Sequence, residues 1–193
     1  MAPTRTFEVR GGSQVASVVF QQLRFQLEEV LIVTPFLHDY FWPLHSKLLS
    51  RLLADQVTEN AAKVTVLTHS PMTEPSSRTQ KRKFELLRSL EEGGVEVEIC
   101  DKLHAKVFLF RRSGFAEVES SLGTCWIVGS ANLTKQGFEY HLELSLQGSI
   151  ANDFERIRRK ALEYVGHSST LQFSQWKAIE KNFVGLASVQ TAT

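Results

Sequence analysis

Short apolar runs and apolar-polar alternation recur along the chain, and their lengths are typical of β-strands. We predict six strands, at Val30–Phe36, Val64–His69, Val95–Cys100, Ala105–Phe110, Thr124–Val128 and Leu142–Gln147. Phe7–Arg10 is a candidate for a further edge strand. Ala105–Phe110 is apolar at nearly every position, which predicts a central strand buried on both faces of a sheet.

Four apolar stripes with helical spacing lie between and after these runs. Their residues are Val15, Val18, Val19, Leu23 and Leu27; Leu44, Leu48, Leu52 and Leu53; Phe84, Leu87 and Leu90; and Phe154, Ile157, Ala161 and Val165. We predict Ser13 as the N-cap of the first helix and Asn152 as the N-cap of the last. Gly93-Gly94 is predicted to end the third helix, and Gly166 lies beyond the end of the fourth.

Strands alternate with helices over roughly the first hundred residues and cluster afterwards. This order predicts an α/β fold with a mixed β-sheet sandwiched between helices, in a single domain covering residues 1–193 with its core at about 6–166. Residues 111–123 are predicted to form a hairpin-like loop between two central strands. In the segment 167–193, Trp176, Ile179 and Phe183 share one face of a short helix that either caps the core or contacts a partner, and a frayed tail follows.

Composition fits a globular protein of 193 residues, with 42% hydrophobic and 22% charged residues. No apolar run approaches the ~20 residues that a membrane-spanning helix needs. Residues 1–10 hold no apolar stretch of the secretory type, so we expect a cytoplasmic protein without a membrane partner. Cys100 and Cys125 are expected to be buried thiols, and no cysteine-histidine cluster has zinc spacing.

The formal net charge of +1 means that any attraction for nucleic acid must be local. Two basic clusters occur: Arg78, Lys81, Arg82, Lys83 and Arg88; and Arg156, Arg158, Arg159 and Lys160. Each can be a solvated helix face. The first is the better candidate for phosphate contact, because a loop-like stretch at Ser70–Thr79 leads into it.

The residues with the clearest chemistry are His104-Ala105-Lys106, followed by Gly129-Ser130-Ala131-Asn132. In a strand, His104 and Lys106 would project from the same face. An imidazole, an ammonium group, a hydroxyl and an amide together suit a tetrahedral phosphate, because Lys106 can neutralise its charge while Ser130 and Asn132 donate hydrogen bonds.

This pattern, with Leu133-Thr134, Gly137 and Leu142-Glu143-Leu144 after it, resembles the phospholipase D superfamily, and most closely the nuclease-like branch with one motif per chain. The resemblance implies that His104 attacks phosphorus and forms a phosphohistidine, while a second histidine acts as general acid and base. It assigns phosphate binding to Lys106, Ser130 and Asn132, and orientation of an imidazole to Glu143. It implies that neither a metal nor another cofactor is needed.

Because this chain carries a single His-x-Lys motif, the resemblance implies a homodimer with one composite site on its twofold axis. Two positions depart from the family pattern. Arg111 stands where the family usually has an aspartate, and His141 stands where some relatives have an asparagine. Together with Lys81, Arg82 and Lys83, these two residues are weaker candidates for substrate binding. His69 ends a predicted strand and is a weak accessory candidate.

We therefore expect a metal-independent phosphodiesterase, and most of all a nuclease acting on nucleic acid, with DNA as the first candidate. A role in DNA processing or in defence against foreign DNA follows from the resemblance alone, and other subunits of a multi-protein system are conceivable partners. Two alternatives remain open. One is a phospholipid phosphodiesterase, and the other is a catalytically degenerate nucleic-acid-binding or assembly subunit, which Arg111 would favour.

Overall fold

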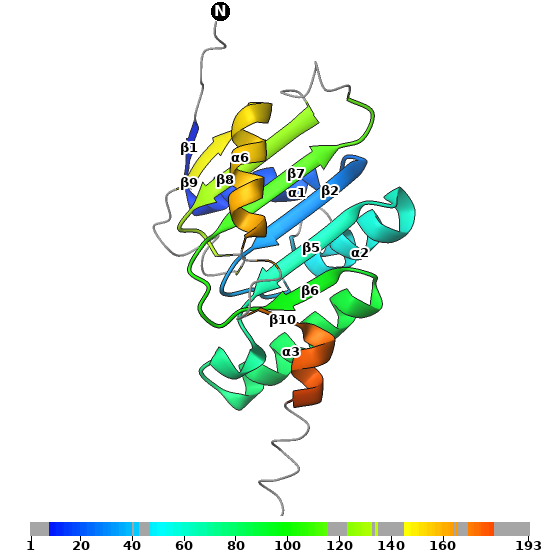
Figure 1. The fold of residues 1–193 in the computed structure, drawn as a ribbon, viewed down its shortest axis with the longest axis vertical. Helices are drawn as coiled ribbons and strands as arrows, with labels where there is room; N and C mark the ends of the chain where they lie inside the picture. The colour runs from blue at the N-terminus through cyan, green and yellow to red at the C-terminus, as the bar shows by residue number, and fades with distance from the viewer. Residues whose placement is uncertain are drawn as a thin grey trace, which may run out of the picture.

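The computed structural model describes residues 8–39, 41–42, 47–115, 123–132, 134, 145–163, 165 and 170–179. Among these residues, eight strands form one sheet in the order β1-β9-β8-β7-β2-β5-β6-β10 (Figure 1). Their bounds are β1 Glu8–Arg10, β2 Leu27–Val33, β5 Lys63–Thr68, β6 Glu96–Ile99, β7 Val107–Arg112, β8 Thr124–Gly129, β9 Ser145–Gly148 and β10 Leu171–Gln172. A separate two-stranded pair is formed by β3 (Phe41–Trp42) and β4 (Lys47–Leu48).

The sheet is mixed, and its strand directions bring several chain segments to one edge. β2, β5 and β6 are parallel neighbours, whereas β7 is antiparallel to β2, β8 to β7 and β9 to β8. As a result, β2, β5, β6 and β8 end at the same edge of the sheet at which β7 and β9 begin. We call it the carboxyl edge, and loops at such an edge commonly carry the functional residues of α/β folds.

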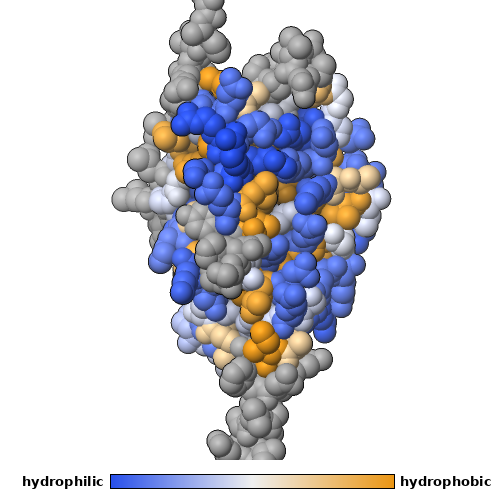
Figure 2. Space-filling model, in the orientation of Figure 1, coloured by the Kyte–Doolittle hydropathy of each residue, from blue (hydrophilic) through white to orange (hydrophobic). Residues whose placement is uncertain are grey.

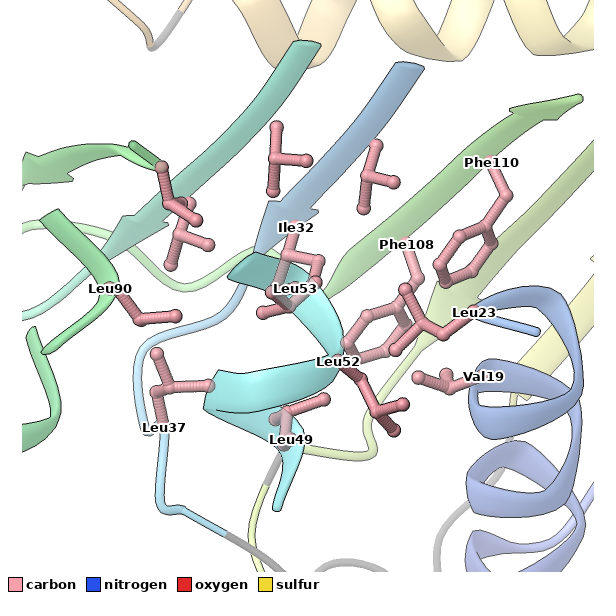
Figure 3. Close-up of a cluster of buried hydrophobic side chains, with 14 of the residues drawn as sticks. Val19, Leu23, Ile32, Leu37, Leu49, Leu52, Leu53, Leu90, Phe108 and Phe110 are labelled. Atoms are coloured by element: carbon pink, nitrogen blue, oxygen red, sulfur yellow. The ribbon is translucent and has the colours of Figure 1, made fainter. Parts of the chain in front are cut away.

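Helices cover both faces of the sheet (Figure 1). α6 (Ala151–Leu162) lies on one face, and α1 (Gly12–Gln22), α2 (Leu49–Asn60) and α3 (Ser77–Glu92) lie on the other. Alternation along each strand supplies both cores. Ile32, Phe108 and Phe110 pack with the helices of the second face (Figure 3), whereas Leu109 and Trp126 pack with Phe154 of α6. The predicted mixed α/β sandwich is therefore confirmed.

Two predicted helix caps are wrong. The N-cap of α1 is Gly11 rather than Ser13, and the amide of Gly11 donates to Oε1 of Gln14 at 3.0 Å. The N-cap of α6 is Ile150 rather than Asn152, because the Ile150 carbonyl already accepts the first helical bond from Phe154 N at 2.9 Å. The helix end at Gly93 is confirmed.

Gly93 is the C-cap of α3, and Gly94 follows with a φ of +83°, a left-handed conformation that favours glycine. Farther along the chain, Arg111 and Arg112 belong to β7 rather than to the predicted loop, of which residues 116–122 lie outside the described part.

The chain after α6 returns to the core. Residues 173–179 are helical, and Phe173 stacks on Trp176 with ring centroids 5.7 Å apart. Both rings are buried and contact Phe84 of α3, while Ile179 is 42% exposed. Phe183 lies outside the described residues. No helix in the described part of the chain is long and apolar enough to cross a membrane.

Candidate active site at the carboxyl edge

His104, Lys106, Ser130 and Asn132 come from two segments that the sheet brings together. His104 and Lys106 directly precede β7, and Ser130 and Asn132 directly follow β8. β7 and β8 are antiparallel, with Val107 opposite Val128, and the amide of Gly129 donates to the Lys106 carbonyl at 3.2 Å. The start of one motif therefore lies beside the end of the other at the carboxyl edge.

The predicted strand Ala105–Phe110 includes Lys106 and directly follows His104, but its predicted start is wrong. β7 begins only at Val107, which pairs with Val33, the last residue of β2. Beyond Val33 the neighbouring chain turns away at Thr34-Pro35, so residues 104–106 have no β2 partner. His104 is exposed and Lys106 half-buried, and Lys106 Nζ donates to the His104 carbonyl at 3.1 Å.

Gly129 is required by a close approach between β8 and β9. A Cβ atom at this position would lie 2.1 Å from Oγ and 2.5 Å from Cα of Ser145, which is sterically impossible without backbone movement. The absence of a side chain lets β9 pair directly at the point where Ser130 begins the loop. Ser130 is exposed in this loop.

Asn132 is half-buried and contacts the loop after β2. The hydroxyl of Thr34 lies 3.0 Å from the Phe36 carbonyl and 3.4 Å from Oδ1 of Asn132. With its oxygen next to Thr34, Asn132 keeps its NH₂ group as a donor for a ligand. The Thr34-Pro35-Phe36 turn thus supports the site from the strand on the other side of β7.

His69 follows β5 and holds the segment that carries His104. Its Nε2 lies 2.7 Å from the Leu103 carbonyl. A carbonyl only accepts, so Nε2 must carry the hydrogen, and Nδ1 is buried without a hydrogen-bond partner among the described residues. Burial lowers the pKa of His69, and the charges of Lys83 and His104 lower it further against the opposing effects of the Leu103 hydrogen bond and Asp101.

The Pro35 carbonyl gathers three donors under the site. The Thr68 hydroxyl, the His69 amide and the Lys83 ammonium lie at 3.1, 3.2 and 3.2 Å from it. These bonds join the loops after β2 and β5 to α3. Asp101 adds a fourth connection, because its carboxylate accepts from the amide of Ser70 at 2.6 Å and from its hydroxyl at 3.1 Å.

Lys83 is a structural residue in this arrangement. Its side chain is fully buried, and Nζ lies 3.2 Å from Oε1 of Glu74. Burial lowers the pKa of Lys83, opposed by Glu74. Burial alone would raise the pKa of Glu74, but the interactions with His38 and Lys83 outweigh it and the pKa is lowered. The structure therefore does not present Lys83 to a substrate.

Three of the other weaker candidates, Lys81, Arg82 and Arg111, lie in described parts of the structure. Lys81 and Arg82 are exposed on α3, where Lys81 lies 4.0 Å from Glu85. Arg111 is at the far end of β7, where it binds Glu29 and Glu155 and lies over the ring of Phe154 at 4.8 Å. Burial alone would lower the pKa of Arg111, but the hydrogen bond and charge of Glu155, with Glu29 and Glu28, raise it.

His141 and Glu143 lie outside the described residues. The described chain resumes at Ser145, which pairs with Gly129. Among the described residues, no group of three or more histidine, cysteine, aspartate or glutamate side chains is arranged to hold a metal ion. Lys106 provides a positive charge at this edge, and Ser130 and Asn132 carry neutral polar side chains.

Sequence reasoning missed the support that Lys83 and Thr34 provide. Lys83, Leu87 and Leu90 share one face of α3 by their spacing, and all three are buried. That spacing was a readable sign that Lys83 points inward. No sequence pattern connects His69 to Leu103, or Thr34 to Asn132, because these contacts join loops far apart in the chain.

Comparisons with known proteins concern the family and the fold. Residues 21–159 match the family described as cardiolipin synthase, PLD-like domain. The chain matches no curated protein. Among solved structures it is similar to Nuc from Salmonella typhimurium, described as a phospholipase D family member, with a TM-score of 0.59 and 11% identity over 86% of this chain and 98% of that one.

NucT from Helicobacter pylori is similar with a TM-score of 0.57 and 14% identity, covering 88% of this chain and 98% of that one. The phosphatidylserine synthase of Haemophilus influenzae is similar with a TM-score of 0.55 and 11% identity, covering 96% of this chain but 46% of that one. At these identities the likenesses concern the fold. Because the family match spans well over half of its length, the chain belongs to the phospholipase D superfamily of phosphodiesterase-type enzymes.

Proposed function

We propose that the protein is a metal-independent nuclease that cleaves phosphodiester bonds through a covalent phosphohistidine at a site shared by two chains. The observation that supports this most is the exposed His104 beside Lys106, at the edge where Ser130 and Asn132 follow β8. An exposed imidazole next to an ammonium and two neutral donors is suited to attack on a phosphorus atom whose oxygens those groups bind.

In the proposed reaction, a ring nitrogen of His104 attacks phosphorus and the bond to one nucleoside oxygen breaks. That oxygen takes a proton from the partner subunit's His104, which enters this step as an imidazolium. Water then attacks the phosphohistidine, its proton passes to the partner subunit's His104, and the phosphorus–nitrogen bond breaks. Lys106 stabilises the added negative charge in both steps, and Glu143 is proposed to orient an imidazole.

The chemistry is tested by incubating the protein in excess EDTA with labelled single-stranded DNA, double-stranded DNA, RNA and phospholipid vesicles. We expect cleavage of nucleic acid to continue in EDTA. Quenching with denaturant at alkaline pH during turnover, where a phosphorus–nitrogen bond survives, should trap a phosphoryl adduct on the peptide that contains His104. Full activity without such an adduct, or activity restored only by Mg²⁺, would contradict the mechanism.

The shared site is tested with mixed dimers. Wild-type and His104→Ala chains are mixed in different ratios, unfolded and refolded together, and the activity of each mixture is measured. If one site needs both histidines, activity follows the square of the wild-type fraction. If each chain works alone, activity follows that fraction linearly. Light scattering at the assay concentration gives the oligomeric state, and a fully active monomer would remove this part of the proposal.

Hydrolysis of phospholipid is the second candidate, because the matching family is described by a cardiolipin synthase. The vesicle arm of the same assay decides between the two substrates. Arg111, which favoured a degenerate subunit on sequence grounds, is engaged by Glu29 and Glu155 and leaves His104 and Lys106 unobstructed. We therefore do not favour the degenerate alternative.

A further inference from the structure

A groove of about 610 Å³ lies between α6 and the sheet next to the carboxyl edge. Its apolar lining comes from strand residues, from Ala105 just before β7 and from α6, and its polar lining comes from α6. The lining residues are Val33, Ala105, Val107, Trp126, Val128, Ile157 and Ala161, with Asp153, Arg156, Arg159 and Lys160. Seen from the side of α6, hydrophilic side chains gather over this helix beside apolar patches (Figure 2).

The groove adjoins the residues of the proposed reaction. Ala105 lies between His104 and Lys106 in the chain, and Val128 comes two residues before Ser130. If a ligand places one phosphate at His104, the part of the ligand next to that phosphate can therefore lie in this groove, along the face covered by α6. A volume of this size accommodates a ligand larger than one phosphate group.

Three cations on α6 border the groove, against the single carboxylate of Asp153. Arg156 and Arg159 are both exposed, and neither forms an ion pair with a described residue. Lys160 binds Glu163 at 2.9 Å, but its side chain is 76% exposed, so this pair holds it only weakly. Arg158 on the same helix is different, because Glu29 binds it at 2.7 Å.

One phosphodiester carries a single negative charge, and in the proposed reaction Lys106 already neutralises the charge of the phosphate at His104. The three cations of α6 are therefore additional to those required for one phosphodiester. Additional cations beside an apolar floor suit a polyanion that also exposes flat apolar surfaces. A single-stranded polynucleotide has both, since its phosphates repeat and its unpaired bases show their faces, whereas a duplex hides those faces by stacking.

We propose that this groove binds the single-stranded nucleotides on one side of the scissile phosphate, an inference that rests on the proposed function. Arg156, Arg159 and Lys160 contact backbone phosphates, and the apolar floor with Ile157 holds an unpaired base. The enzyme then prefers single-stranded over double-stranded substrate.

The charge contribution is tested with the double variant Arg156→Ala/Arg159→Ala. The matched control is Arg24→Ala/Lys63→Ala, which removes the same charge from exposed positions beside the starts of β2 and β5, at the opposite edge of the sheet. Binding of a fluorescein-labelled single-stranded oligonucleotide is measured by anisotropy over a salt series. All proteins carry His104→Ala to prevent cleavage.

We expect the groove variant to bind at least tenfold more weakly and the control to stay within twofold. The slope of log Kd against log salt should fall by about 1.4 for two lost phosphate contacts, at roughly 0.7 per contact for single strands. Equal losses in both variants, or no loss in the groove variant, would overturn the inference. A duplex of the same sequence binding as tightly as the single strand would do the same.

The apolar floor is tested separately with Ile157→Ser, whose folding is checked by thermal denaturation. We expect weaker binding with an unchanged salt slope. The difference from wild type should vanish for an oligonucleotide with abasic positions beside the scissile phosphate. A difference that persists on the abasic probe would overturn the assignment of the floor to a base.

Failure of this inference is distinguishable from failure of the proposed function. If wild type cleaves nucleic acid while the groove variants bind normally, the function stands and the groove assignment falls. If wild type neither binds nor cleaves nucleic acid but hydrolyses phospholipid vesicles, both fall.

Discussion

The two ends of β7 both carry cations, but the structure treats them in opposite ways. At the last residues of β7, on the edge of the sheet opposite to the carboxyl edge, Arg111 binds Glu29 and Glu155 and covers the ring of Phe154. Arg112 lies over the ring of Phe25 at 3.6 Å. At the amino end, His104 is exposed and the Nζ of Lys106 donates to a backbone carbonyl. One end uses its charges to join α6 and α1 to the sheet, and the other leaves an imidazole and an ammonium accessible to a ligand.

This contrast shows how to separate structural from functional charge in the chain. A cation engaged by carboxylates and an aromatic ring, as Arg111 is, contributes to packing. Lys83 is the extreme case, since it is fully buried against Glu74 under the site. By this criterion we propose Lys106, and not Lys83, as the lysine that binds phosphate, although the sequence offers both as candidates.

The largest effect should come from His104→Ala. If His104 is the nucleophile, turnover falls on the order of 10⁴-fold or more, because no other group forms the covalent bond. The thermal midpoint should remain near that of wild type, since exposed side chains contribute little to stability. Single-turnover cleavage and calorimetry on the same preparation measure both quantities, and substantial residual turnover would remove His104 from the nucleophile role.

Lys106→Ala should have the next largest effect on the catalytic rate. We expect a loss of about 2–4 kcal/mol of transition-state stabilisation, by comparison with removal of an oxyanion donor, or roughly 10²–10³-fold in kcat/KM. Lys63→Ala is the control, because Lys63 is an exposed lysine at the opposite edge of the sheet. Equal rates for the two variants would show that the amino end of β7 does not supply the charge.

His69 gives a sharper test, because two amide substitutions separate its ring positions. His69→Gln places an NH₂ group near the position of Nε2 and can restore the bond to the Leu103 carbonyl. His69→Asn places its amide near Nδ1 and cannot. If His69 positions the His104 segment, His69→Asn should lower kcat by about 10–100-fold with little change in KM, whereas His69→Gln stays within a few-fold. Equal kcat values in the two variants would exclude this positioning role.

Arg111→Ala should affect stability rather than rate. Breaking its interactions with Glu29 and Glu155 should lower the free energy of unfolding by about 1–3 kcal/mol, with kcat within twofold of wild type. Urea denaturation and steady-state kinetics test the two parts. A loss of rate comparable to that of Lys106→Ala would break the contrast between the two ends of β7 and revive Arg111 as a substrate contact.

The sequence predicted the presence and order of most strands and helices, because burial of one face produces a hydrophobic period along each element. β2 (Leu27–Val33) nevertheless begins and ends three residues before the predicted Val30–Phe36. β5 (Lys63–Thr68) and β8 (Thr124–Gly129) agree with the predicted strands to within one residue at each end. Helix caps were less predictable. Ser13 and Asn152 have side chains that favour N-cap positions, but the helices begin earlier in the structure, with Gly11 and Ile150 as their N-caps. The residues of the motif were found by pattern, whereas the bond from His69 to Leu103 depends on where two loops meet.

The smallest effect is a dependence of stability on pH that comes from His69. Burial lowers its pKa in the folded protein, with Lys83 and His104 acting in the same direction and Asp101 against them. Below the ordinary pKa of 6.5 the unfolded chain therefore binds a proton that the folded chain refuses, so the free energy of unfolding falls as pH falls from 6.5 toward the lowered value. One such proton changes stability by at most about 1.4 kcal/mol per pH unit. Urea denaturation between about pH 5.5 and 7.5 should show this slope in wild type and a weaker one in His69→Gln, because the other histidines are common to both proteins. The same slope in both would mean that His69 titrates normally, so that burial does not disfavour its protonated form in the folded protein.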